Sequence, residues 1–117
     1  MTILKSIQQM LSPPEAPPLS SLEGRSIFRV DKGALQLEVH ESRKWRWLSL
    51  GDRPDIVQAL FNRKYPHHPM MSYCVGMLTA LLIQPQARQA LNLGLGCGAF
   101  ERYLLRHYSQ TALTSVE

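Results

Sequence analysis

Three glycines, Gly94, Gly96 and Gly98, alternate with other residues in the C-terminal third of the chain. Apolar residues before them (90–93) predict a buried strand, and the helical spacing of aromatic and leucine residues after them predicts a helix. Glycine permits a sharp turn, close approach of a ligand to the backbone, and close packing of helix on strand. Free N–H groups at the start of a helix bind polar or anionic groups, so the pattern indicates a ligand site.

An acidic residue, Glu117, follows these glycines after about twenty residues. Residues 112–116 predict a second strand, which places Glu117 at the strand tip. An acid there can accept hydrogen bonds from both hydroxyls of a ribose. The GxGxG spacing favours a nucleoside-type ligand over NAD, because the NAD fingerprint is GxGxxG. The structural alternative is a glycine-rich turn that binds no ligand.

The segment 93–98, together with the closing Ser115-Val116-Glu117, resembles the first motif and the ribose-binding acid of class I AdoMet-dependent transferases. Within that group, the sequence from about residue 27 onward is similar to the spermidine synthase-like (polyamine aminopropyltransferase) family. The resemblance implies an α/β fold: an N-terminal antiparallel β-meander followed by the first β-α-β of a truncated Rossmann-like domain. The upstream positions that carry it are Val57-Gln58, Pro66, Tyr73, Met77 and Leu81-Leu82.

The resemblance also implies a ligand and a reaction. The ligand would be a nucleoside sulfonium, AdoMet or decarboxylated AdoMet, or the product methylthioadenosine, and no metal is expected. An aminopropyl or methyl group would pass to an acceptor such as an amine, in a reaction that depends mainly on positioning the two partners. Cys97 and Tyr73 would line the reacting end. The residues implied in ligand binding are Gly94, Leu95, Gly96, Cys97, Gly98, Glu117 and Tyr73.

Two features of the sequence depart from that family. Spermidine synthases resemble GGGDGG in this turn, with an aspartate where this chain has Cys97, and a Tyr-Gln pair where it has Ser72 and Tyr73. The alternative function is therefore a catalytically inactive binding or assembly protein that retains the fold.

The composition predicts a globular protein, with 117 residues, 44% hydrophobic residues and a net charge of +4. The basic residues are spread along the chain, which argues against nucleic acid as a partner. Two cysteines without CxxC spacing and no signal peptide predict reduced thiols in the cytoplasm. No apolar run is long enough to cross a membrane.

The chain divides into an N-terminal arm with a proline-rich linker (1–22), an antiparallel β-module (23–62) and a truncated nucleoside-binding domain (63–117). Parallel strands normally lie inside larger sheets. We therefore expect either a fragment that is inactive alone, which we favour, or a homo-oligomer that completes its sheet with a partner subunit at the exposed sheet edge. The family resemblance also implies a homo-oligomer assembled through the β-module. The expected elements are helices at 3–11 and 70–82, the latter ended by Pro85, and strands at 27–30, 35–40, 44–50 and 56–61.

Two further motifs could bind ligands, but their patterns favour structural roles. Trp45 and Trp47 lie among basic residues, as in nucleic-acid sites, yet their alternation places both on one packed face of a strand. The neighbours His67 and His68 point in different directions, which favours the start of a helix at Pro69 over a metal site.

Overall fold

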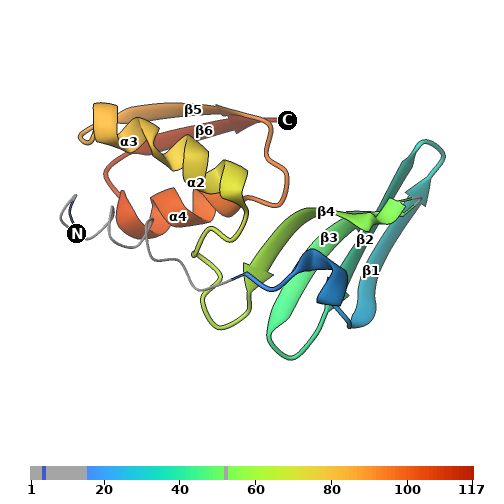
Figure 1. Ribbon diagram of the computed structural model, residues 1–117. Helices are drawn as coiled ribbons and strands as arrows, with labels where there is room; N and C mark the ends of the chain where they lie inside the picture. The colour runs from blue at the N-terminus through green and yellow to red at the C-terminus, as the bar shows by residue number, and fades with distance from the viewer. Residues whose placement is uncertain (1–3, 5–15, 52) are drawn as a thin grey trace.

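Period-two patterning in the first half of the chain produces four antiparallel strands, and helical patterning in the second half accompanies two parallel strands (Figure 1). This computed structural model describes residue 4, residues 16–51 and residues 53–117, apart from the side chain of Pro54. The helix expected at 3–11 therefore lies, except for residue 4, outside the described residues. The fold is mixed α/β with two separate sheets.

The antiparallel sheet is the expected meander, with strand order β1-β2-β3-β4. A short 3-10 segment, η1 (Leu19–Ser21), precedes it. Gly33 has a φ of 59° in the turn between the first two strands, a value that tight hairpin turns require. The strands are β1 (Arg25–Lys32), β2 (Leu35–Glu41), β3 (Trp45–Leu50) and β4 (Arg53–Asn62).

The fourth strand begins earlier than the expected 56–61, because its backbone pairs from Arg53 onward. Proline lacks an N–H and would interrupt an inner strand. Here Pro54 lies in the last strand of the sheet, where the register with β3 shifts on either side of Ser49. An irregular edge of this kind tolerates proline.

The core of this sheet forms around the two tryptophans. Trp45 and Trp47 are 8% and 6% exposed and pack with Leu60 of β4 and Met70 from the following loop. Leu22, which the sequence placed in the linker, packs against the same cluster. The structural interpretation of the tryptophan pair is therefore confirmed.

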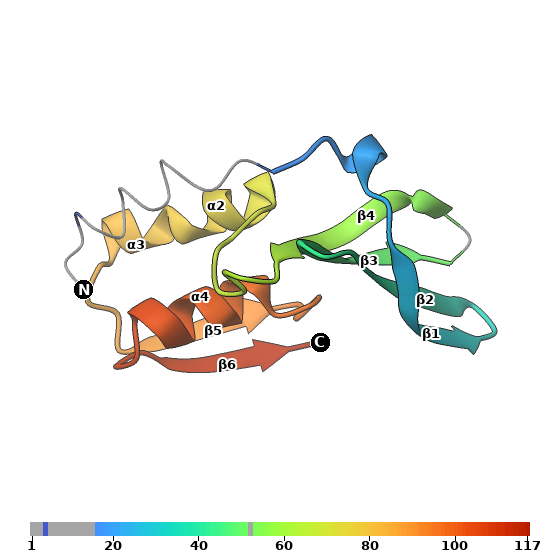
Figure 2. The same cartoon turned by 90° about the horizontal axis from the view of Figure 1, so that it is seen from below.

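The second unit has the predicted strand, helix, strand order around the glycine turn. Its two strands pair in parallel, with Gln89 opposite Ala112 and Leu93 opposite Val116. Figures 1 and 2 place helix α4 and the α2–α3 pair side by side on the same side of this sheet. The elements are α2 (Ser72–Leu78), α3 (Ala80–Ile83), β5 (Gln89–Leu93), α4 (Ala99–His107) and β6 (Ala112–Val116).

The single helix expected at 70–82 is wrong in two respects. It begins at Ser72, three residues after Pro69, and it is interrupted at Thr79. The N–H and the hydroxyl of Thr79 both donate to the Gly76 carbonyl, at 3.1 and 2.5 Å. Glycine weakens a helix and a threonine hydroxyl competes for its carbonyls, so the helix breaks at this point.

The buried side of α2 packs against α4, as the helical stripe predicts. Leu78 is fully buried and packs with Tyr103, which is 1% exposed. On the opposite face of the parallel sheet, Leu91, Leu93 and Val116 are 66%, 78% and 51% exposed. Among the described residues, no helix is both long and apolar enough to cross a membrane.

Candidate functional site

The glycine turn between β5 and α4 has a backbone that other residues rarely adopt. Gly94, Gly96 and Gly98 have φ values of 91°, 56° and 73°. Residues with a Cβ pay about 1–2 kcal/mol in this left-handed region. A Cβ on Gly98 would lie 3.8 Å from its nearest neighbour, which is an ordinary contact. The expected role of Gly98 in close packing of the helix is therefore wrong, and its backbone conformation explains the glycine.

The expected proximity of the acid and the turn is present. The Gly94 N–H donates to the Val116 carbonyl at 2.5 Å, which extends the parallel pairing into the turn. One residue further, the Leu95 N–H donates to the Glu117 carboxylate at 2.6 Å. The tip of β6 therefore fixes the start of the turn.

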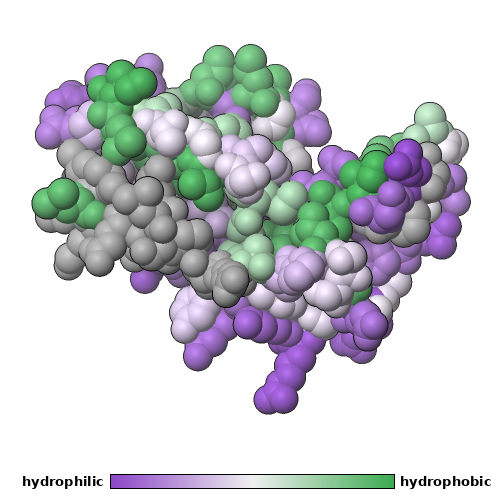
Figure 3. Space-filling view, in the orientation of Figure 1, coloured by the Kyte–Doolittle hydropathy of each residue, from purple (hydrophilic) through white to green (hydrophobic). Residues whose placement is uncertain are grey.

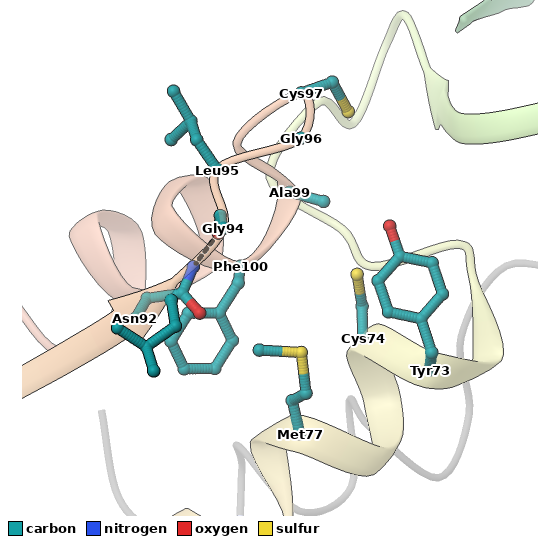
Figure 4. A pocket seen from close by; sticks show the side chains of 11 residues that line it. Tyr73, Cys74, Met77, Asn92, Gly94, Leu95, Gly96, Cys97, Ala99 and Phe100 are labelled. Atoms are coloured by element: carbon teal, nitrogen blue, oxygen red, sulfur yellow. Dashed lines mark hydrogen bonds between the residues drawn. The ribbon is translucent and has the colours of Figure 1, made fainter. Parts of the chain in front are cut away.

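A cavity of about 230 Å³ lies between the glycine turn and α2. In Figure 4 the Tyr73 ring and the Cys74 sulfur extend from α2 toward the turn. Of the expected binding residues, Gly98 and Glu117 do not line the cavity: one begins α4 and the other holds the turn. The lining residues are Tyr73, Cys74, Met77, Asn92, Leu93, Gly94, Leu95, Gly96, Cys97, Ala99 and Phe100.

A buried polar network under the turn was missed from the sequence. Asn92, 6% exposed, donates to the Gly94 carbonyl at 2.9 Å and also to the Glu101 carboxylate. The Ser115 hydroxyl donates to the same carboxylate oxygen at 2.6 Å. Glu101 therefore connects β5, β6 and α4. Two signals could have found it: an asparagine inside an apolar strand, and an acid in the first turn of a helix.

The wall formed by α2 is uncharged at neutral pH. Partial burial raises the pKa of Tyr73 to about 12, and its hydroxyl donates to the Gln58 carbonyl of β4 at 3.4 Å. Burial also raises the pKa of the Cys74 thiol. Both groups therefore stay protonated, and this side of the cavity suits the neutral part of a ligand.

Arg102 of α4 connects the turn to the antiparallel sheet. Its guanidinium donates to the Cys97 carbonyl at 2.5 Å and to the Pro66 carbonyl at 2.8 Å. The guanidinium carbon also lies 4.5 Å from the centre of the Phe61 ring at the end of β4. A positive charge therefore borders the Cys97 end of the cavity.

The neighbouring histidines do not start a helix, contrary to expectation, but pack beside the end of α4. The rings of His67 and His107 have centroids 5.6 Å apart. Burial lowers the pKa of His107 to about 4, with smaller contributions from His67 and Arg106, and burial also lowers the pKa values of His67 and His68. Within the described part of the chain, no group of three potential ligand side chains could hold a metal ion.

Comparison of the chain with protein-family models, with curated proteins and with solved structures found no significant match. The assignment of function therefore rests on the geometry of the turn, the acid and the cavity.

Proposed function

We propose that this chain is the nucleoside-binding part of a Rossmann-like transferase of the spermidine synthase-like type. Its ligand would be AdoMet, decarboxylated AdoMet or methylthioadenosine, and the whole protein would transfer an aminopropyl or methyl group. The observation that carries the proposal is the Glu117 carboxylate, which lies 2.6 Å from the Leu95 N–H. A ribose seated over the turn would meet this acid with its two hydroxyls.

The cavity suits part of such a ligand. Its volume of about 230 Å³ is smaller than the roughly 300–1,000 Å³ of pockets that enclose a drug-sized molecule. Met77 and Phe100 offer apolar contacts, and Cys97 and Tyr73 lie at the proposed reacting end. No carboxylate lines the cavity among the described residues, so its contribution would be to position the reacting sulfonium.

Calorimetric titration of the chain with methylthioadenosine, AdoMet and decarboxylated AdoMet tests this proposal. We expect at least one of them to bind at a single site, and NAD to bind more weakly. We expect the 117-residue chain to show no turnover by itself. Absence of binding by all three nucleosides would overturn the proposal.

The second candidate is a binding or assembly protein without catalysis. Cys97 favours it, because this position in the glycine turn carries a thiol where spermidine synthases have a carboxylate. A transfer assay on the full-length protein distinguishes the two: nucleoside binding without transfer to amine or other acceptors supports the inactive form.

We also propose that the protein self-associates in the cytoplasm. Leu91, Leu93 and Val116 form an exposed apolar face on a parallel sheet, and such sheets are normally covered on both faces. Sedimentation velocity should show association that Leu91→Lys weakens, while Leu105→Lys, on exposed α4 surface, leaves it unchanged. Cys74 and Cys97 are free thiols, which fits a reducing compartment.

A further inference from the structure

The carboxylate of Glu41 is outnumbered by the guanidinium groups around it. Glu41 is buried and accepts a hydrogen bond from Arg46 at 2.9 Å. Arg63 and Arg25 lie 3.3 and 3.9 Å from its other oxygen. The bond from Arg46, with the charges of its neighbours, lowers the pKa of Glu41, so this acid stays ionised. Three positive charges against one negative leave the cluster with an excess of two.

This cluster is continuous with the Cys97 end of the cavity. The guanidinium carbon of Arg46 lies 5.8 Å from the Phe61 ring centre, and that of Arg102 lies 4.5 Å from it. Both guanidinium groups therefore lie within cation–π distance of the Phe61 ring. Arg102 in turn bonds the Cys97 carbonyl. We call Arg25, Arg46, Arg63 and Arg102 the arginine track.

Little negative charge offsets this track. The sequence has no aspartate or glutamate between Asp55 and Glu101. Glu101 itself lies under the turn, where Asn92 and Ser115 donate to it. Figure 3 shows hydrophilic side chains gathered along the lower edge of the molecule, beneath the junction of the two units.

The track also has donors to spare. A guanidinium group has five N–H donors. The side chain of Arg25 is 80% exposed, and those of Arg46 and Arg63 are each 39% exposed. Their contacts to Glu41 and to the backbone use part of this capacity. The planar guanidinium group of arginine can donate two parallel hydrogen bonds to two oxygens of one phosphate group. The N–H groups that do not contact Glu41 or the backbone could bind phosphate in this way.

We propose that the arginine track binds the phosphate groups of the acceptor substrate, which would reach the reacting end of the cavity past Cys97. This inference rests on the proposed nucleoside site. The same guanidinium groups would repel a polyamine, so the acceptor class differs from that of spermidine synthases.

Titration of the 117-residue chain with tripolyphosphate at low salt, followed by backbone amide shifts, tests the inference. We expect saturable shifts at residues 61–66 and at Cys97, and no saturable binding of spermidine. Arg25→Gln should raise the Kd at least threefold. Lys32→Gln removes a positive charge from an exposed site at the far end of the same strand and should change the Kd less than twofold.

Absence of tripolyphosphate binding, equal losses in both variants, or spermidine binding of similar strength would overturn the inference. Binding of a single-stranded oligonucleotide without binding of tripolyphosphate would also overturn it, and would indicate a nucleic-acid surface instead. A separate titration with methylthioadenosine isolates the proposed function. Tripolyphosphate binding without nucleoside binding supports the phosphate site and overturns the transferase proposal, and the reverse result overturns the phosphate site alone.

Discussion

The carboxylate of Glu117 accepts a hydrogen bond from the backbone N–H of Leu95 over 2.6 Å. The two residues are 22 positions apart in sequence, and the parallel pairing of β5 and β6 brings them together. The same acid therefore fixes the entrance of the glycine turn, and in the proposed function it would also bind the ribose. Its removal should affect ligand binding more than folding, because the bond is exposed to solvent.

Replacement of this acid tests its role in binding. Glu117→Ala should weaken methylthioadenosine binding by about 10- to 100-fold, since hydrogen bonds to charged groups contribute about 1.5–3 kcal/mol. Calorimetry measures the change. Glu23→Ala, at another exposed acid, is the matched control and should leave the affinity unchanged. An unchanged affinity in Glu117→Ala would remove the acid from the site.

Substitution of Gly96 and of Gly76 by alanine distinguishes the effect of backbone strain on stability from the effect of packing. A Cβ on Gly96 or on Gly76 would meet nothing within 4 Å, but only Gly96 of the two has a positive φ, of 56°. Gly96→Ala should therefore destabilise the fold by about 1–2 kcal/mol. Gly76→Ala, inside α2, should stabilise it by about 0.5–1 kcal/mol. Urea unfolding of both variants measures the difference, and equal effects would contradict the assignment of strain to the turn.

The network under the turn should contribute to stability. Asn92→Leu removes the donor to the Gly94 carbonyl and one of the two donors to the Glu101 carboxylate, and should cost about 2–3 kcal/mol of unfolding free energy. Ser115→Ala removes one donor and should cost about half as much. Thr114→Ala, on the exposed face of β6, should change stability by less than about 0.5 kcal/mol. If Asn92→Leu has the same free energy of unfolding as the Thr114→Ala control, the network does not contribute to stability.

Stability should fall in mild acid because of the histidines beside α4. Burial lowers the pKa of His107 from 6.5 to about 4 and lowers those of His67 and His68. The unfolded chain therefore takes up protons near pH 6.5 while the folded chain does not. The free energy of unfolding therefore has its full value above pH 6.5 and decreases as the pH falls from 6.5 toward 4. Urea unfolding between pH 7.5 and 4.5 measures the slope, which His107→Gln should reduce. An unchanged slope in that variant would contradict the assignment.

Local patterns were sufficient to predict the six strands and the helix after the glycine turn, but not the division of the helix expected at 70–82. The alternation of apolar residues predicted the meander, and residues 90–117 predicted the order strand, glycine turn, helix and strand. Both predictions were possible because apolar residues recur every two residues in a strand and about every 3.6 residues in a helix. Their bounds were less accurate. The break at Thr79 and the early start of β4 at Arg53 depend on a side-chain hydrogen bond and on an irregular pairing, which apolar periodicity does not report.

The sequence by itself determined that the turn needs glycine and that an acid follows the second strand, since both are properties of short segments. Only the tertiary structure decided which distant groups meet. Asn92 and Ser115 converge on Glu101, and Arg46 and Arg102 converge on Phe61, although long stretches of chain separate them. The physical reason is that strand pairing and helix packing, rather than neighbouring sequence, set the distances between these side chains.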